Sequence, residues 1–209
     1  MENAVGFYWT LPVTWAQFVE LPKDLEAAAN ASKTIRYQME LIRRYAKDHD
    51  YNLIHEEVFL EIEPDRGSVH IQSALDFIER MCRTNRATIL VVDFSVVQNW
   101  RRNGYMDEWF ENTDMPFIRI PPDPLLSAEW TFDPGQHFGD WRKRHSDWMS
   151  SKHEREVFAL RRSLELQKTG LSVNVLAQRL NSEKIPSPTG KPWSESNLRA
   201  FLKKHRSGF

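Results

Sequence analysis

The sequence is poor in cysteine, in glycine and in long hydrophobic runs. It has 209 residues, with one cysteine (Cys82) and eight glycines. A single cysteine excludes an internal disulfide and a cysteine-rich zinc site. No apolar run reaches the roughly 18 residues that a membrane-spanning helix needs, and no glycine-rich phosphate-binding loop is present. We therefore expect neither a membrane protein nor a disulfide-stapled secreted protein, and no cofactor or small-molecule substrate.

The amino terminus and the lone thiol also bear on location. Met1-Glu2-Asn3 lacks the basic segment that opens a secretory signal peptide. A single cysteine is typical of proteins in a reducing compartment. We expect a cytoplasmic protein, nucleoid-associated if it binds DNA. Hydrophobic residues make up 41% of the chain, enough for a packed core in one large or two small domains.

Charge is divided unevenly along the chain. Residues 1–140 hold 13 Lys+Arg and 23 Asp+Glu, a net charge of −10. Residues 141–209 hold 15 and 6, a net charge of +9. A basic region beside an acidic one indicates a segregated part that binds a polyanion. The alternative is two solvated surfaces of opposite sign that attract each other.

Apolar runs alternate with helical patterns over the first 121 residues. Strand-like runs occupy 4–11, 52–62, 87–94 and 116–121, and helical patterns occupy 33–48, 70–83 and 105–112. The run 87–94 is continuously apolar, as in a strand buried on both faces. Residues 12–32 are irregular and fit either a long loop or a short helix. The alternation predicts an α/β fold with a mostly parallel sheet covered by helices.

An aromatic segment follows, and we interpret 123–149 as a linker. It looks loop-like over 125–150 and carries Trp130, Phe132, Phe138, Trp141 and Trp148. Surface connectors rarely carry so many aromatic side chains, so we expect this segment to pack back on the protein.

The remaining residues, 150–209, predict a small helical domain. Helical spacing over 152–168 places Val157, Leu160, Leu164 and Gln167 on one face, with Arg161 and Arg162 on the other side. A second helix over 172–181 is capped by Ser172 and has its own apolar face, formed by Val173, Leu176, Ala177 and Leu180. The residues that break the chain after it are Pro186, Pro188 and Gly190.

The last helix has two distinct sides. Ser194 is a good N-cap, and Trp193 and Leu198 occupy the positions of a hydrophobic staple. At about 100° per residue, one side carries Leu198, Phe201, Leu202 and His205, and the opposite side carries Ser196, Arg199, Ala200 and Lys203. The second side is small, cationic and able to hydrogen-bond, as a recognition helix in a major groove needs.

We therefore predict a helix-turn-helix-like DNA-binding domain over 150–209. The candidate DNA-binding residues are Arg179, Lys191, Ser196, Arg199, Lys203 and Lys204. Any solvated helix also favours Arg and Lys, so the regional charge of +9 carries much of this prediction.

The same segment resembles a known family. From Val157 to Arg206 it is similar to the recombinase domain that follows the catalytic domain in large serine recombinases. The matching features are Gly170-Leu171-Ser172, Ala177 with Leu180-Asn181, Ile185-Pro186 and Trp193-Ser194. The resemblance implies that this domain binds DNA.

The amino-terminal part resembles the resolvase-type catalytic domain in its order of elements. Residues 37–54, with Gln38 and Tyr45-Ala46, are similar to the family's first helix, and 87–95 to its central apolar strand. The resemblance implies a resolvase-like parallel sheet with flanking helices over 1–122, and a homodimer.

The family's catalytic residues are missing from the aligned positions. Where the family has its Tyr-x-Arg-x-Ser run, residues 7–12 read Phe-Tyr-Trp-Thr-Leu-Pro, leaving only Thr10 and Thr14 as nearby hydroxyls. The Asp-Arg-x-x-Arg motif is replaced at 95–100, with Arg101 and Arg102 following later. The Asp-x-x-Ser-Gly segment is replaced at 61–66, where only Arg66 is cationic.

Phosphoryl transfer needs a positioned nucleophile and cations that match the developing charge. We therefore expect a catalytically inactive DNA-binding protein derived from a serine recombinase, acting as a regulator or an architectural factor. One alternative is a divergent but active site-specific recombinase that uses Thr10, Thr14 or another hydroxyl. The other is a scaffold that does not bind DNA, with its basic domain docked on its acidic domain.

Two further features, the histidines and Asp93, are only weak indications of a metal site or a catalytic site. The seven histidines show no metal-ligand spacing, so no metal site is expected. Asp93 lies at the end of a predicted strand, where a catalytic carboxylate could lie in an α/β fold. An aspartate at such a position more often caps the next turn.

Overall fold

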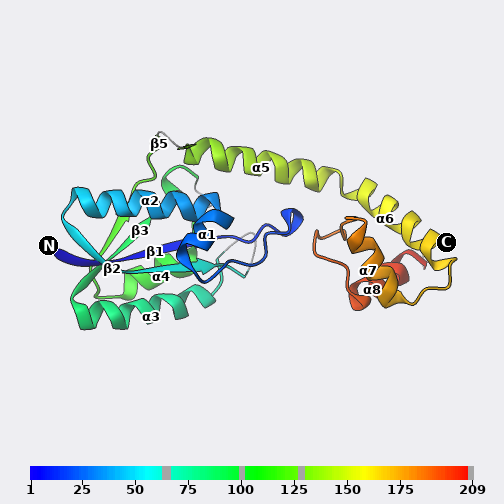
Figure 1. Cartoon of the computed structure of the whole chain (residues 1–209), viewed down its shortest axis with the longest axis horizontal. Helices are drawn as coiled ribbons and strands as arrows, with labels where there is room; N and C mark the ends of the chain where they lie inside the picture. The colour runs from blue at the N-terminus through cyan, green and yellow to red at the C-terminus, as the bar shows by residue number, and fades with distance from the viewer. Residues whose placement is uncertain (63–66, 99–101, 127–129, 207–209) are drawn as a thin grey trace. The chain divides into compact units, whose positions relative to one another are not determined.

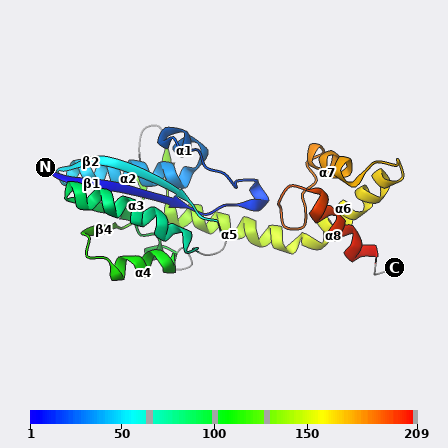
Figure 2. The same ribbon diagram turned by 90° about the horizontal axis from the view of Figure 1, so that it is seen from below.

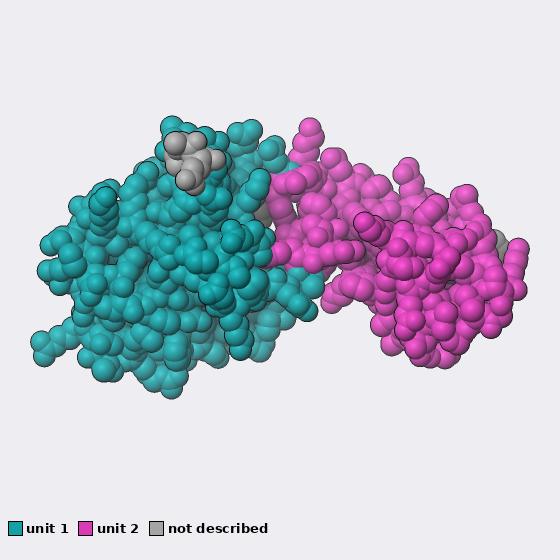
Figure 3. Space-filling view, in the orientation of Figure 1, with its two compact units in different colours: residues 1–12, 19–140 teal, residues 13–18, 141–209 magenta. Residues whose placement is uncertain are grey.

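The computed structural model describes residues 1–62, 67–98, 102–126 and 130–206, and it contains two compact units. Unit 1 comprises Met1–Pro12 and Val19–Asp140, and unit 2 comprises Val13–Phe18 and Trp141–Phe209 (Figure 3). Unit 2 is therefore assembled from two separate stretches of chain. Residues 13–18, within the predicted range 1–122, belong to unit 2.

Unit 1 is built on a four-stranded parallel sheet. Its strands are β1 (Glu2–Thr10), β2 (Tyr51–Leu60), β3 (Ala87–Val92) and β4 (Phe117–Ile120). They lie in the order β2-β1-β3-β4, and every neighbouring pair is parallel. β3 is buried along almost its whole length, as its continuous apolar run predicted. The α/β fold with a parallel sheet is confirmed.

Helices cover both faces of this sheet. They are α1 (Leu25–Ala31), α2 (Lys33–Asp48), α3 (His70–Asn85) and α4 (Gly104–Asn112). α2 lies over one face and α3 over the other (Figures 1 and 2). The predicted apolar stripe of α3 is buried, with Ile71, Leu75, Ile78 and Cys82 in the core. Between β1 and α2 the chain forms a 3-10 turn, η1 (Thr14–Ala16), and then α1, so the short-helix interpretation of this region holds.

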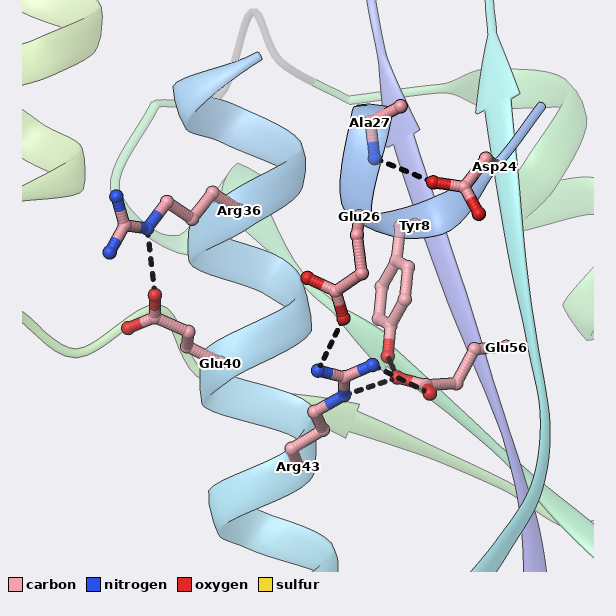
Figure 4. Close-up of polar contacts among 8 residues, drawn as sticks. All are labelled: Tyr8, Asp24, Glu26, Ala27, Arg36, Glu40, Arg43 and Glu56. Atoms are coloured by element: carbon pink, nitrogen blue, oxygen red, sulfur yellow. Dashed lines mark hydrogen bonds and ion pairs between the residues drawn. The ribbon is translucent and has the colours of Figure 1, made fainter. Parts of the chain in front are cut away.

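A polar network joins α1, α2 and the sheet (Figure 4). The Tyr8 hydroxyl donates to Glu56 at 2.5 Å. Arg43 donates to both oxygens of Glu56, at 2.8 and 3.0 Å, and to Glu26 at 3.1 Å. Burial, together with the nearby Glu56 carboxylate, raises the pKa of the Tyr8 hydroxyl well above its ordinary value. Tyr8 therefore stays protonated and acts as a fixed donor from β1 to Glu56 of β2, and Arg43 joins the same carboxylate to α2.

The aromatic segment is partly helical, so the prediction of a loop over 125–150 is wrong. It forms the short strands β5 (Leu125–Leu126) and β6 (Thr131–Phe132) and then α5 (Pro134–Ser150). Its aromatic side chains do pack back, as expected. Phe132 stacks on Tyr37 with ring centroids 4.5 Å apart, and Phe138 meets Phe94 edge-on at 5.0 Å. These rings are part of the core of unit 1.

Unit 2 contains the carboxy-terminal helices α6 (Lys152–Gln167), α7 (Val173–Ser182) and α8 (Glu195–Arg206). α7 packs against both α6 and α8. The core consists mainly of Ala159, Leu166, Leu176, Ala177, Leu180, Ile185, Trp193, Leu198, Phe201 and Leu202. The predicted cap of α7 is present, because the Ser172 hydroxyl accepts from the backbone N–H of Val175.

The predicted inner face of α6 is only partly right: Leu160 packs against the core of unit 2, but Val157 and Leu164 do not. Its buried residues are Ala159, Ser163 and Leu166. Val157 and Leu164, expected on the inner face, are 43% and 41% exposed. The physical reason is that small residues let α7 approach closely, and the Ser163 hydroxyl is satisfied within the helix by the carbonyl of Ala159 at 2.7 Å.

No helix in the described ranges combines the length and the hydropathy that a transmembrane helix needs.

Candidate nucleic-acid interface

The start of α8 is fixed by a reciprocal cap. The Ser194 hydroxyl accepts from the backbone N–H of Asn197 at 3.2 Å, and the Asn197 side chain accepts from the backbone N–H of Ser194 at 2.8 Å. Trp193 and Leu198 lie in the same buried cluster, as the predicted staple requires. The cap thus sets where the helix begins, and with it the direction in which each later side chain points.

The two sides of α8 are those that the sequence predicted. Leu198, Phe201 and Leu202 are buried, and His205 packs against Phe201 with ring centroids 4.6 Å apart. The residues of the outer side are all exposed, and we call them the α8 outer side: Ser196, Arg199, Ala200, Lys203 and Lys204. Because the inner side carries the packing, the outer side can be changed without loss of the core.

Arg199 already has an acidic neighbour one turn back. Its guanidinium donates to Glu195 through Nε at 3.0 Å and Nη2 at 2.6 Å. Both side chains are largely exposed, so this ion pair contributes little to stability. A DNA phosphate or base edge would have to compete with Glu195 for the same donors.

The other two candidates lie off α8. Arg179, exposed on α7, donates to Glu183 at 3.0 Å. Lys191 is exposed in the loop between α7 and α8. The structure therefore brings four of the six candidates together on α8 and places Arg179 and Lys191 on neighbouring segments.

Glu183 connects α6 to the end of α7, a role that the sequence analysis did not anticipate. Arg162 donates to both of its oxygens, at 2.8 and 2.7 Å. The hydrogen bonds from Arg162 hold the pKa of Glu183 below its ordinary value, and Arg179 adds to the effect. Arg162, predicted on the outer side of α6, is half-buried in this bidentate pair.

Asn181 joins the two ends of the loop between α7 and α8, because it binds Trp193. Its side-chain oxygen accepts from the backbone N–H of Trp193 at 2.8 Å, and its amide donates to the carbonyl of Trp193 at 2.9 Å. The indole N–H of Trp193 donates to the carbonyl of Ile185 at 2.9 Å. The end of α7 is thereby held beside the start of α8. Leu180-Asn181 was one of the features that the segment shares with the recombinase domain, but spacing along the chain indicated no partner for Asn181.

The carboxyl edge of the sheet is where a catalytic site would lie in unit 1. Thr10, the hydroxyl nearest the family's serine position, is only 5% exposed. Thr14 belongs to unit 2, where its hydroxyl donates to the carbonyl of Thr189 at 3.3 Å. Thr10 and Thr14 therefore belong to different compact units.

The described arginines near this edge are committed to carboxylates. Asp107 is buried and accepts from Arg102 at 2.5 Å and from Arg119 at 2.7 Å. Asp93 caps η2 (Phe94–Val96) by accepting from the backbone N–H and the hydroxyl of Ser95, at 3.0 and 2.6 Å. Asp93 thus plays the commoner capping role. Arg66 and Arg101, the other cations considered from the sequence, lie outside the described residues.

The segment that replaces the family's Asp-x-x-Ser-Gly motif begins with a buried carboxylate. Glu61 is 1% exposed and accepts from the backbone N–H of Ser68 at 3.0 Å, the Ser68 hydroxyl at 2.7 Å and the Asn103 amide at 2.5 Å. Asn103 also caps α4 through the N–H of Met106. A carboxylate satisfied in this way holds loops together and offers no cation to a phosphate.

Across the ranges that the structure describes, no three His, Cys, Asp or Glu side chains form a group that could hold a metal ion.

The comparison with protein families agrees with this geometry. Residues 154–207 match the Recombinase family model. The match covers α7, α8 and nearly all of α6, so this segment is similar to the Recombinase family. No curated protein and no solved structure matches the chain.

Proposed function

We propose that this protein binds DNA through the outer side of α8 and performs no strand exchange. In this proposal unit 2 is a helix-turn-helix-like module in which α8 is the recognition helix. Unit 1 is a resolvase-like domain that has lost its catalysis. The protein would act as a regulator or an architectural factor derived from a serine recombinase.

One observation carries the proposal. The α8 outer side is exposed, small and cationic, and it lies within the segment that matches the Recombinase family. Ser196, Arg199 and Lys203 follow one another at helical spacing with no bulky side chain between them. Such a surface can approach base edges closely, while Lys203 and Lys204 can reach phosphates.

The loss of catalysis is supported by the carboxyl edge of unit 1. Its described arginines, Arg102 and Arg119, both pair with Asp107. Its buried Glu61 takes the place of a family motif that supplies a serine. Negative charge that accumulates on a transferring phosphate would meet carboxylates here, which raises the barrier.

The experiment measures the DNA affinity of the full-length protein against salt concentration. Arg199→Ala should weaken binding by about 1–3 kcal/mol at a preferred site and relax preference at one base pair. Lys203→Ala and Lys204→Ala should weaken binding to all sequences and reduce the salt slope by about one unit each. Lys152→Ala removes an exposed cation from α6 and serves as the matched control.

Two outcomes would contradict the proposal. If Arg199→Ala and Lys203→Ala bind DNA as the unchanged protein does, α8 does not contact DNA and the scaffold alternative gains support. If a covalent adduct forms on nicked DNA and maps to a Ser or Thr, the protein is an active recombinase.

A further inference from the structure

The outward face of α6 carries large apolar side chains that nothing in the proposed DNA-binding role requires. Val157, Phe158 and Leu164 are 43%, 54% and 41% exposed. They alternate with exposed charged residues along one side of the helix, and we call the whole set the α6 outer stripe: Glu154, Val157, Phe158, Arg161, Leu164, Glu165 and Lys168.

This stripe has the spacing of a helix-pairing surface. Its members recur three and four residues apart over almost the whole of α6, so they form one continuous band. The opposite side of α6, with Ala159, Ser163 and Leu166, is the one packed inside unit 2. Exposed large apolar residues gathered on one band indicate a surface that binds another protein.

The stripe carries two acidic and two basic side chains, so it has no net positive charge with which to attract DNA. Glu154 and Glu165 are exposed and acidic. They would lie beside any phosphate brought to this face and would repel it.

Parts of the α6 outer stripe would complement the same stripe of a second, antiparallel helix. Phe158 lies about 4.5 Å before Arg161 along the helix axis, and Leu164 lies about 4.5 Å after it. Glu154 and Lys168 lie about 10.5 Å on either side of Arg161. Two copies of α6 placed antiparallel, with their Arg161 residues level, would therefore bring Phe158 against Leu164 and Glu154 against Lys168.

We propose that α6 pairs antiparallel with α6 of a second copy of this chain. Phe158 packs against the partner's Leu164, and Glu154 forms an ion pair with the partner's Lys168. Each contact occurs twice, because the arrangement has two-fold symmetry. The inference is independent of the proposed DNA binding.

The same geometry sets the strength of the association. Arg161 lies beside the two-fold axis, so the two guanidinium groups oppose each other. The contact involves one helix from each copy, which makes a small interface. The dimer should therefore be weak and concentration-dependent, and Arg161→Leu should strengthen it about tenfold by replacing repulsion with apolar contact.

Analytical ultracentrifugation of the full-length protein over a range of concentrations tests the pairing. Glu154→Lys alone and Lys168→Glu alone should each weaken the dimer about tenfold, because each sets like charges against each other twice. The double variant, Glu154→Lys with Lys168→Glu, should restore the affinity, since the pairs are reformed with their signs exchanged. Leu164→Glu should leave the protein monomeric.

Cross-linking locates the axis. Arg161→Cys should form a disulfide-linked dimer under mild oxidation, because only a residue beside the axis meets its own copy. Lys152→Cys, exposed on the same helix but away from the axis, is the matched control. The native Cys82 is buried and does not interfere.

Thermal unfolding at low protein concentration shows that these exposed substitutions leave the fold intact. A protein that stays monomeric at all concentrations would overturn the proposal. So would a dimer that survives Leu164→Glu in a folded protein, or a double charge variant that fails to recover. DNA affinity measured in parallel keeps failure of the pairing distinct from failure of the proposed function.

Discussion

Gly190 lies directly against the backbone of Trp15. A Cβ atom added at Gly190 would lie 2.7 Å from the Cα atom of Trp15 and 2.9 Å from its nitrogen. The φ angle of Gly190 is +79°, in the region that favours glycine. Trp15 in turn stacks on Trp148 with ring centroids 6.3 Å apart. The loop between α7 and α8 is thus held by a segment that follows β1 in the sequence, which explains why unit 2 is not continuous.

This close approach predicts that Gly190→Ala will destabilise unit 2 more than Gly170→Ala. Both glycines have positive φ, so each substitution costs about 1 kcal/mol in backbone strain. Among the residues that the structure describes, no atom lies within 4 Å of the Cβ position at Gly170, whereas the backbone of Trp15 blocks that position at Gly190. Denaturant unfolding followed by tryptophan fluorescence gives the difference. Equal losses in the two variants would show that the contact with Trp15 is not tight.

The ion pair on α8 predicts that Glu195→Gln will increase DNA affinity. Glu195 holds the Arg199 guanidinium and would lie close to an approaching phosphate. Removing its charge frees the donors and reduces repulsion, so binding should tighten about tenfold at low salt, with a smaller gain at high salt. The measurement is DNA affinity at two ionic strengths. Glu108→Gln, at an exposed position on α4 of unit 1, is the control and should leave DNA binding unchanged.

Much of the fold followed from periodicity, because hydrophobic spacing records which side of an element is buried. The stripe of α3 and the two sides of α8 were predicted residue by residue. The face of α6 was not, because Ala159 and Ser163 face inward while Val157 and Leu164 do not. Hydrophobic periodicity assigns the large apolar residues to the buried face. Where two helices pack closely, however, the contact positions are often taken by small residues such as Ala159 and Ser163.

The contacts that fix the candidate interface were less accessible to sequence reasoning. Ser194 was predicted as a cap because capping is local and depends on adjacent residues. The pairing of Asn181 with Trp193 and of Arg162 with Glu183 crosses a loop or joins two helices. Such contacts depend on tertiary packing, which spacing along one element does not encode.

The lowered pKa of Glu183 predicts a dependence of stability on pH. Because the folded-state pKa lies below the ordinary value of 4.5, the charged form contributes stability above that value. This contribution is lost as pH falls through the folded-state pKa, when the carboxylate is protonated and its bonds to Arg162 weaken. Glu183→Gln should therefore be less stable than the unchanged protein at pH 7, and the gap should close below pH 4.5. A gap that stays constant down to pH 3 would exclude an electrostatic origin.

Cys82 offers a probe of unit 1 alone. Burial is the main cause that raises the pKa of its thiol to about 11. The side chain lies on the inner face of α3, in the core of unit 1, and is inaccessible to solvent. It should not react with a thiol reagent at pH 8 in the native protein, and it should react once unit 1 unfolds. Following its modification in denaturant gives the stability of unit 1 separately. Rapid modification of the native protein would show that α3 opens locally.

The hydrogen bonds between Asn181 and Trp193 should support both the stability of unit 2 and DNA binding by α8. Asn181→Ala removes both hydrogen bonds to Trp193 and should destabilise unit 2 by about 1–3 kcal/mol. DNA affinity should fall with stability, because the start of α8 is then held less firmly beside α7. Asn174→Ala, at an exposed position near the start of the same helix, is the matched control and should alter neither property. Thermal unfolding and DNA binding measured on both variants decide the point. If Asn181→Ala loses stability but keeps full affinity at a temperature where it is folded, α8 is oriented by its apolar core alone.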